Sequence, residues 1–145
     1  MLLGHPVLFK SLCYVDGRWI HSDSAASIAV TNPADQQVIG HVPMLDKPQI
    51  VSAIDAADRA FQSWRWVPQQ KRSALLLRWH ELIMRHLSDL AGILSLEQGK
   101  PLAESKGEIG SSAAYILWFA EEGRRVYGDI VPSPWGDEGD EVDES

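Results

Sequence analysis

The hydrophobic pattern of the chain changes its period at Pro43, and this change restricts the fold more than any other feature of the sequence. Before Pro43, in residues 13–43, apolar residues stand in short segments of the kind that form strands. After Pro43 they recur every three or four residues, as they do along one face of a helix. The sequence therefore predicts a small β region followed by a mostly helical remainder.

The β region contains one strong hairpin signal. Tyr14–Val15 and Trp19–Ile20 flank Asp16–Gly17, and Asp-Gly is the pair that a two-residue type I′ turn prefers. Two further strands, separated by a turn, are expected at residues 27–31 and 38–42. These strands are too short to form a large sheet.

Three helices are expected, over residues 46–65, 68–98 and 101–127. Asp46 is a suitable N-cap for the first helix. Gly99, followed closely by a proline, is a stop signal at the end of the second. Within that second helix, Ser88–Asp89 could restart the helix after a kink. The apolar stripes of these helices are wide and need a partner surface, which the short strands do not offer. We therefore expect a helical layer that lacks its sheet, which is an incomplete domain.

The two ends of the chain differ from the part between them. Residues 1–12 are expected to form a loose N-terminal arm, and residues 133–145 an acidic disordered tail. The formal net charge is -7, but six of the 20 acidic residues lie in residues 137–145, and the remaining 14 face 13 basic residues. This balance argues against a strongly basic nucleic-acid-binding surface.

The sequence shows no sign of secretion or of membrane insertion. The N-terminus has no basic region ahead of its apolar residues, so no secretory signal is expected. No apolar run approaches the roughly 18 residues of a membrane span. The single cysteine, Cys13, cannot form an internal disulfide, which favours a reducing compartment. We therefore expect a cytoplasmic protein that acts on neither nucleic acid nor membrane.

Few residues are arranged for chemistry. His80–Met84 begins like a zinc-protease motif, but methionine stands where the second ligand is needed. His80 and His86 are about 240° apart around a helix and cannot share a metal, so both are interpreted as surface histidines. Cys13 has no basic residue in the next four positions, which favours a structural role over a nucleophilic one.

Several motifs nevertheless occur in an order typical of one enzyme family. They are Tyr14–Trp19 (YVDGRW), Thr31–Ala34 (TNPA), Ala53–Phe61 (AIDAADRAF), Leu96–Glu104 (LEQGKPLAE), Lys106–Ile109 (KGEI) and Trp118–Arg125 (WFAEEGRR). In this order they resemble the aldehyde dehydrogenase superfamily, and within it the succinate-semialdehyde dehydrogenase branch. The resemblance covers about residues 14–132, and residues 13–132 are interpreted as the N-terminal part of such a domain.

The resemblance implies an α/β enzyme with a Rossmann-like NAD(P) domain, a catalytic domain and an oligomerisation arm. This chain corresponds to only the first quarter to third of it. The family's catalytic cysteine, general-base glutamate and nucleotide-binding glycine motif lie beyond this segment. The resemblance therefore implies no catalytic and no cofactor-binding residue here, and no NAD(P) bound by this chain alone.

Two weaker sites follow from the same resemblance. Thr31 and Glu97 match positions near which family members hold a monovalent cation, although capping of a helix end explains them equally well. Ser111, Tyr115 and Trp118 share the face of the third helix that borders the family's substrate tunnel, although plain core packing is an equal interpretation.

Two functions are thus open for the chain. It is either an N-terminal fragment of an NAD(P)-dependent (succinate-)semialdehyde dehydrogenase, inactive alone, or a non-catalytic truncated protein. In the second case it docks on a full-length aldehyde dehydrogenase, or on itself, through exposed apolar helix faces, or it is a degenerate product.

Overall fold

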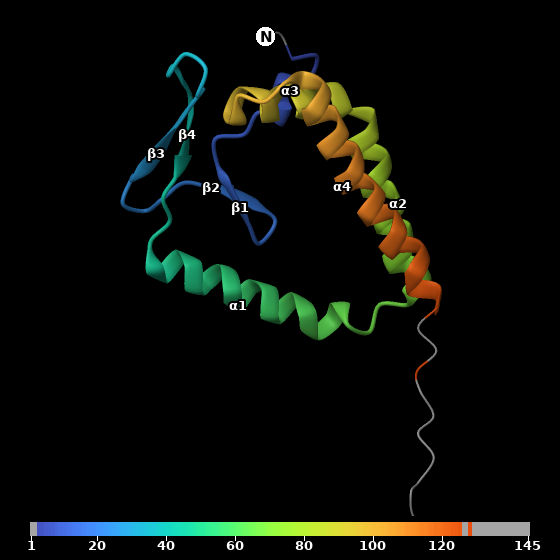
Figure 1. Ribbon diagram of the computed structural model, residues 1–145. Helices are drawn as coiled ribbons and strands as arrows, with labels where there is room; N and C mark the ends of the chain where they lie inside the picture. Colours follow the sequence, from blue (N-terminus) through green and yellow to red (C-terminus); the bar gives the residue numbers. More distant parts are fainter. Residues whose placement is uncertain (1–2, 126–127, 129–145) are drawn as a thin grey trace, which may run out of the picture.

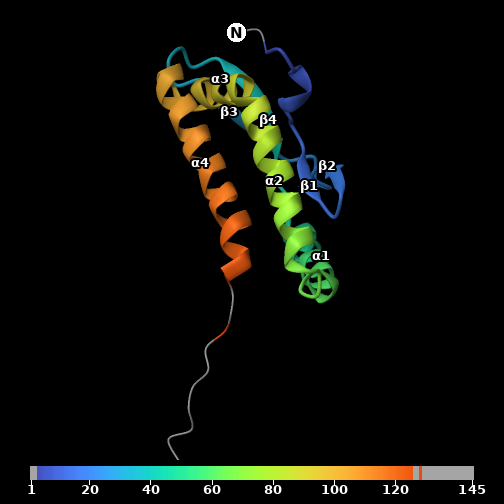
Figure 2. The same cartoon turned by 90° about the vertical axis from the view of Figure 1, so that its right-hand side faces the viewer.

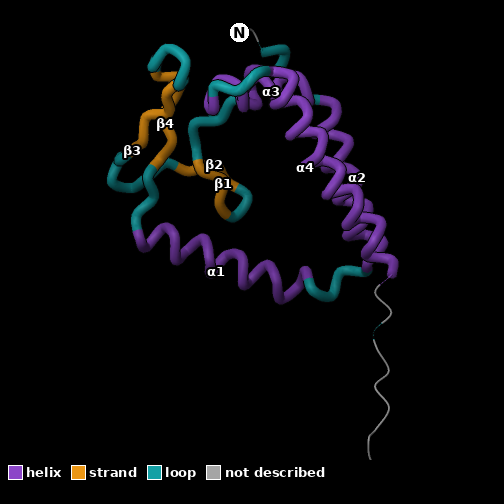
Figure 3. The backbone as a smooth tube through the Cα atoms, in the orientation of Figure 1, coloured by secondary structure: helices purple, strands orange, loops and turns teal. Residues whose placement is uncertain are grey.

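The computed structural model describes residues 3–125 and residue 128. Its strands are β1 (Cys13–Val15), β2 (Arg18–Ile20), β3 (Ser27–Thr31) and β4 (Val38–Pro43). Its helices are α1 (Lys47–Trp64), α2 (Gln69–Arg85), α3 (Leu87–Gln98) and α4 (Leu102–Glu122), with single 3-10 turns at Pro6–Leu8 and Gly123–Arg125. Helices dominate, and the strands are confined to the N-terminal third (Figure 3). This agrees with the predicted fold class of a mostly helical chain with a small hairpin region.

The strands form two separate two-stranded antiparallel sheets. In the first, Asp16 and Gly17 link β1 to β2 with φ angles of 48° and 76°, both positive as a type I′ turn requires. Tyr14 pairs with Trp19 across this hairpin, and their rings lie 5.1 Å apart between centroids. The second sheet pairs β3 with β4 and has an irregularity at Val30/Thr31.

Helix α1 begins at a complete capping box. The Asp46 side chain accepts from the backbone N–H of Gln49, and the Gln49 side chain accepts in return from the N–H of Asp46. Gln49 Nε2 also donates to the carbonyl of His21 at 3.0 Å, which ties the start of α1 to the segment after β2. The local signal at Asp46 therefore positions α1 against the hairpin region.

The apolar stripe of α1 remains uncovered by the described residues. Ile50, Ile54 and Phe61 are each at least half exposed, and only Ala56 of this helix is buried. In Figure 1, α1 runs below the hairpins and apart from the α2–α4 pair. The stripe indicates a helix made to pack against a surface, and no described element supplies that surface.

The tightly packed part of the molecule is the group of α2, α3 and α4. Figure 2 shows α2 and α4 side by side with α3 across one end. Ala91, Ala113 and Ala120 are fully buried there, and Ser73 Oγ donates to the carbonyl of Ala120 at 2.7 Å. Small side chains at this contact allow the helix backbones to approach closely, so the core contains no large, fully enclosed side chain among the described residues.

The helix predicted over residues 68–98 is divided into α2 and α3 at His86. His86 has φ -105° and ψ 16°, outside the helical region, and its N–H bonds to carbonyls of the last turn of α2. The chain changes direction there, so α3 lies across the end of α4 instead of continuing α2 (Figure 2). Hydrophobic periodicity continues through such a break, which is why periodicity alone predicts one helix.

No helix among the described residues is long and apolar enough to cross a membrane. The end of the third predicted helix, residues 126–127, and the predicted acidic tail, residues 133–145, lie outside the described residues.

Candidate functional site

Helix α4 carries an open, mostly apolar concavity. Its lining residues are Ser111, Ala114, Tyr115, Trp118 and Phe119, and its volume is about 410 Å³. The predicted tunnel residues Ser111, Tyr115 and Trp118 recur at helical spacing, so they share one face and all line this groove.

This α4 groove suits binding rather than reaction chemistry. Tyr115, Trp118 and Phe119 are 69%, 61% and 61% exposed, so their rings form an open apolar wall. The side-chain polar groups in the lining are the hydroxyls of Ser111 and Tyr115 and the indole N–H of Trp118. Apolar walls with a few polar groups are typical of small-molecule sites. The substrate-tunnel role of these three residues stays a prediction.

The predicted cation residues lie on neighbouring segments. Thr31 ends β3, Glu97 is in the last turn of α3, and both are exposed. Gly99 caps α3 with φ 70° and packs on the turn that follows Thr31, so that a Cβ at position 99 would lie 2.6 Å from Pro33 Cγ. The fold thus brings together the two segments that carry Thr31 and Glu97. A cation there stays a prediction.

Cys13 has the surroundings of a structural residue. It lies in β1, is half-buried, and its Sγ donates to the carbonyl of Pro43 at 3.8 Å. A main-chain carbonyl supplies neither positive charge nor a base that could take the thiol proton. The sequence-based interpretation of Cys13 agrees with this position.

The interpretation of His80 and His86 as surface histidines is wrong. Both are half-buried, and His80 Nδ1 lies 2.9 Å from the carbonyl of Ala113, where it joins α2 to α4. His86 instead faces the N-terminal arm. Its ring meets the ring of His5 edge-on, with the centroids 4.5 Å apart.

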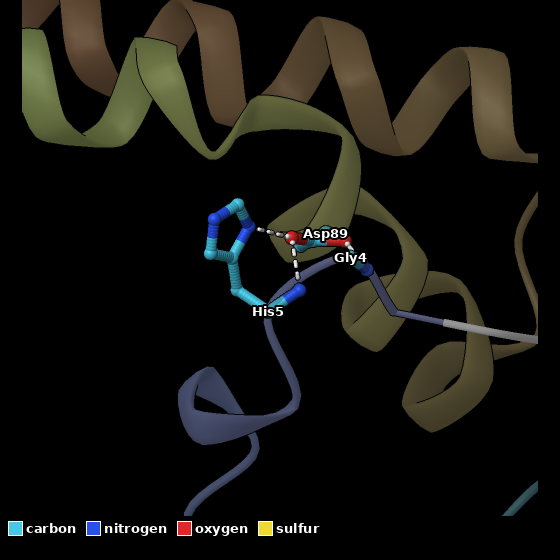
Figure 4. Close-up of polar contacts among 3 residues, drawn as sticks. All are labelled: Gly4, His5 and Asp89. Atoms are coloured by element: carbon cyan, nitrogen blue, oxygen red, sulfur yellow. Dashed lines mark hydrogen bonds and ion pairs between the residues drawn. The ribbon is translucent and has the colours of Figure 1, made fainter.

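A cluster of polar side chains is formed where the N-terminal arm crosses the α2–α3 junction (Figure 4). Asp89 Oδ1 accepts from the N–H of Gly4 at 2.8 Å, and Asp89 Oδ2 accepts from the N–H of His5 at 3.0 Å. His5 Nδ1 also lies 3.0 Å from Asp89 Oδ2. The spacing of His86 and Asp89 along the chain gives a faint signal for this site. The contact with His5, more than 80 residues away, gives none.

These contacts change the ionisation of Asp89. The hydrogen bond from the Gly4 backbone, followed by that from the His5 side chain, holds the pKa of Asp89 below its ordinary value of 3.8. A carboxyl group whose pKa is lower in the folded than in the unfolded chain stabilises the fold above the unfolded pKa. That contribution is lost as the pH falls through the folded pKa.

We therefore expect the N-terminal arm to detach in acid, below about pH 4. In a pH titration followed by amide NMR, the Gly4 and His5 signals should move to their unfolded positions with a midpoint below 3.8. Asp89→Asn should remove this transition. Asp55→Asn, on the exposed side of α1, is the control and should leave it unchanged. A midpoint at or above 3.8 would contradict the expectation.

Known proteins resemble this chain in both sequence and structure. The family model described as "Aldehyde dehydrogenase family" matches residues 19–143, and so extends beyond the resembling motifs, which end near Pro132. The glutarate-semialdehyde dehydrogenase of Pseudomonas putida KT2440 is 47% identical over 132 residues, 91% of this chain and 28% of the relative. The NADP(+) succinate-semialdehyde dehydrogenase of Escherichia coli K12 is 44% identical over 137 residues, 94% of this chain and 28% of the relative.

Solved structures give the same result. An aldehyde dehydrogenase from Brucella melitensis biovar abortus 2308 matches with a TM-score of 0.91 and 46% identity, over 94% of this chain and 28% of that one. The succinate-semialdehyde dehydrogenase of Burkholderia pseudomallei matches with a TM-score of 0.87 and 44% identity, over 91% and 27%. The chain therefore spans a little over a quarter of the length of these relatives.

Proposed function

The chain belongs to the aldehyde dehydrogenase family, and on that basis we propose that it is the N-terminal part of an NAD(P)-dependent semialdehyde dehydrogenase. The intact enzyme would oxidise an aldehyde that also carries a carboxylate, with the nicotinamide cofactor accepting a hydride when bound. The observation that supports this most is the fold match to the Brucella enzyme, with a TM-score of 0.91 over 94% of this chain.

Within that enzyme, this chain's own contribution would be to bind and position. The α4 groove offers one apolar wall for the carbon chain of the aldehyde. Its polar groups are the hydroxyls of Ser111 and Tyr115 and the indole N–H of Trp118. Its five lining residues include no thiol, imidazole, carboxylate or cationic group. We propose that this segment performs no bond-making step.

We also propose that the described residues do not hold a dinucleotide. A pyrophosphate is usually held at a helix N-terminus behind a glycine-rich turn, whereas α2 and α4 each follow a single proline, Pro68 and Pro101. We therefore propose that the chain alone binds no NAD(P). We also propose that the protein is cytoplasmic.

Two measurements test this proposal. The purified 145-residue chain, mixed with succinate or glutarate semialdehyde and NAD+ or NADP+, should form no NAD(P)H above background. A chimaera in which residues 13–125 replace the matching segment of the E. coli relative should form it. Turnover by the chain alone, lost in Cys13→Ala, would overturn the proposal. So would a chimaera with the relative's circular-dichroism spectrum but no turnover.

The role of the α4 groove is tested in the same chimaera. Trp118→Ala should raise KM for the semialdehyde about tenfold, roughly 1.4 kcal/mol of lost apolar contact, with a smaller effect on kcat. Trp66→Ala is the control, because Trp66 is 75% exposed and lies outside the groove. Equal effects of the two substitutions would remove the groove from the proposal.

The exposed apolar faces support a second candidate function. The α1 stripe and the wall of the α4 groove are uncovered by the described residues, and apolar patches of this kind mark interaction surfaces. In this case the chain would dock on a full-length aldehyde dehydrogenase or on a second copy of itself. Light scattering of the chain alone, and co-purification with the E. coli relative, would distinguish these outcomes. A monomer that binds nothing would count against both.

A further inference from the structure

We propose that His5, His86 and Asp89 form a binding site for a divalent transition-metal ion such as Zn²⁺, which would fasten the N-terminal arm to the α2–α3 junction. One ligand atom from each of the three residues lies within 4.8 Å of the other two. Figure 4 shows His5 and Asp89 directed toward each other, one from the arm and the other from the first turn of α3. This site is separate from the α4 groove and does not depend on the proposed function.

The donor set selects the class of ion. Two imidazoles and one carboxylate suit Zn²⁺ and its transition-metal neighbours, whereas Mg²⁺ and Ca²⁺ prefer oxygen ligands throughout. Ligands at about 2.0–2.2 Å from Zn²⁺ lie about 3–3.5 Å from one another. Two ligand atoms that lie as far as 4.8 Å apart must therefore approach each other by about 1.5 Å when the ion binds. The His5 side chain is 57% exposed and lies on the arm, so a rotation of its ring is sterically open.

The two half-buried residues of the site, His86 and Asp89, are already prepared for an ion. His86 Nδ1 is enclosed and has no hydrogen-bond partner among the described residues. An unpaired buried polar atom of this kind calls for an additional partner, such as a water or an ion. The Asp89 side chain is only 14% exposed, and the N–H of Gly4 holds its second oxygen in place. A hydrogen bond of this kind orients a metal-ligating carboxylate.

Binding would replace a proton with the ion. In the structure His5 Nδ1 and Asp89 Oδ2 share a hydrogen bond. The ion would take the place of the hydrogen in this bond, because an imidazole nitrogen ligates through its lone pair. A neutral imidazole then carries its single ring proton on the other nitrogen, Nε2. The exposed side of His5 leaves room for water as a further ligand. The ligands come from segments more than 80 residues apart, so ion binding should stabilise the fold.

The test uses the tag-free 145-residue chain with Zn²⁺ alone as the ligand, at pH 7.5. Isothermal titration calorimetry should show one Zn²⁺ per chain, and histidine-ring NMR should show shifts at His5 and His86. His5→Asn should weaken the affinity for Zn²⁺ by at least about tenfold. Loss of a residue that only hydrogen-bonds to a metal ligand already has an effect of this size. His21→Asn and His41→Asn are matched controls, since both residues are exposed and lie outside the cluster.

A second readout does not depend on any variant. Zn²⁺ should raise the Tm of the unmodified chain, whereas the same concentration of Mg²⁺ should not. The proposal is overturned if Zn²⁺ gives neither a one-to-one isotherm nor a Tm shift, or if His21→Asn weakens binding as much as His5→Asn does. Far-UV circular dichroism verifies that the His5 variant keeps its helices, and His5 contributes no buried apolar surface whose loss would unfold them.

Discussion

Gly99→Ala is expected to lower the free energy of unfolding by about 2–4 kcal/mol. Gly99 ends α3 with φ 70°, and a side chain in this left-handed conformation costs roughly 1–2 kcal/mol. The new Cβ would also lie 2.6 Å from Pro33 Cγ, well inside van der Waals contact. Pro33 is held in a rigid turn and cannot withdraw without moving the β3–β4 hairpin. Urea denaturation followed by circular dichroism at 222 nm measures the loss.

The matched control is Gly107→Ala, which should have the opposite sign. Gly107 lies in α4 with nothing within 4 Å of a new Cβ. Alanine in a helix interior is favoured over glycine by up to about 1 kcal/mol, so this variant should be slightly more stable. Similar losses from both substitutions would show that the contact between Gly99 and Pro33 is not what holds α3 against the hairpin.

The other large effect is expected at the contact between α2 and α4. Ala113→Leu should reduce stability by about 1–3 kcal/mol. Ala113 is fully buried, and its carbonyl lies 2.9 Å from His80 Nδ1. A larger side chain would force the two helices apart and stretch this bond, together with the one between Ser73 and Ala120. In a fold whose total stability is about 5–15 kcal/mol, such a loss is large.

Ala114→Leu is the control for this prediction, because it makes the same change at the next position. Ala114 is exposed and lines the α4 groove, so leucine there should alter stability by no more than about 0.5 kcal/mol. Thermal unfolding of the two variants side by side gives the comparison. A larger loss in Ala114→Leu than in Ala113→Leu would mean that the groove, and not the α2 contact, is the more tightly packed face of α4.

The elements that were predictable from the sequence depend on local chemistry. Asp16–Gly17 favours a type I′ turn between two strands. Asp46 can cap a helix without contacts from distant residues. Gly99 ends a helix because its own backbone adopts a positive φ. The sequence allows a kink before Ser88–Asp89 but does not place the break at His86, because periodicity carries through it and only the packing of α3 across α4 shows the change in direction.

The candidate sites divide in the same way. Ser111, Tyr115 and Trp118 could be grouped in advance because helical spacing places them on one face, and the structure finds them in one groove. For His80 and His86, the sequence gives only their positions around a helix, and these predict surface residues. Their true partners are the carbonyl of Ala113 on α4 and the ring of His5 on the arm. The spacing of residues along one helix cannot predict those partners, since each belongs to a distant segment of the chain.

The sequence by itself thus determined most of the elements and the family, because turns, caps and apolar periodicity act over a few residues and the motifs are read directly. Only the tertiary structure decided which surfaces meet. It shows that serine and alanine are the buried residues between α2 and α4, while several large apolar side chains of α1 and α4 remain exposed. It also brings His5 to Asp89. Contacts of this kind depend on the relative placement of whole elements, which local sequence does not encode.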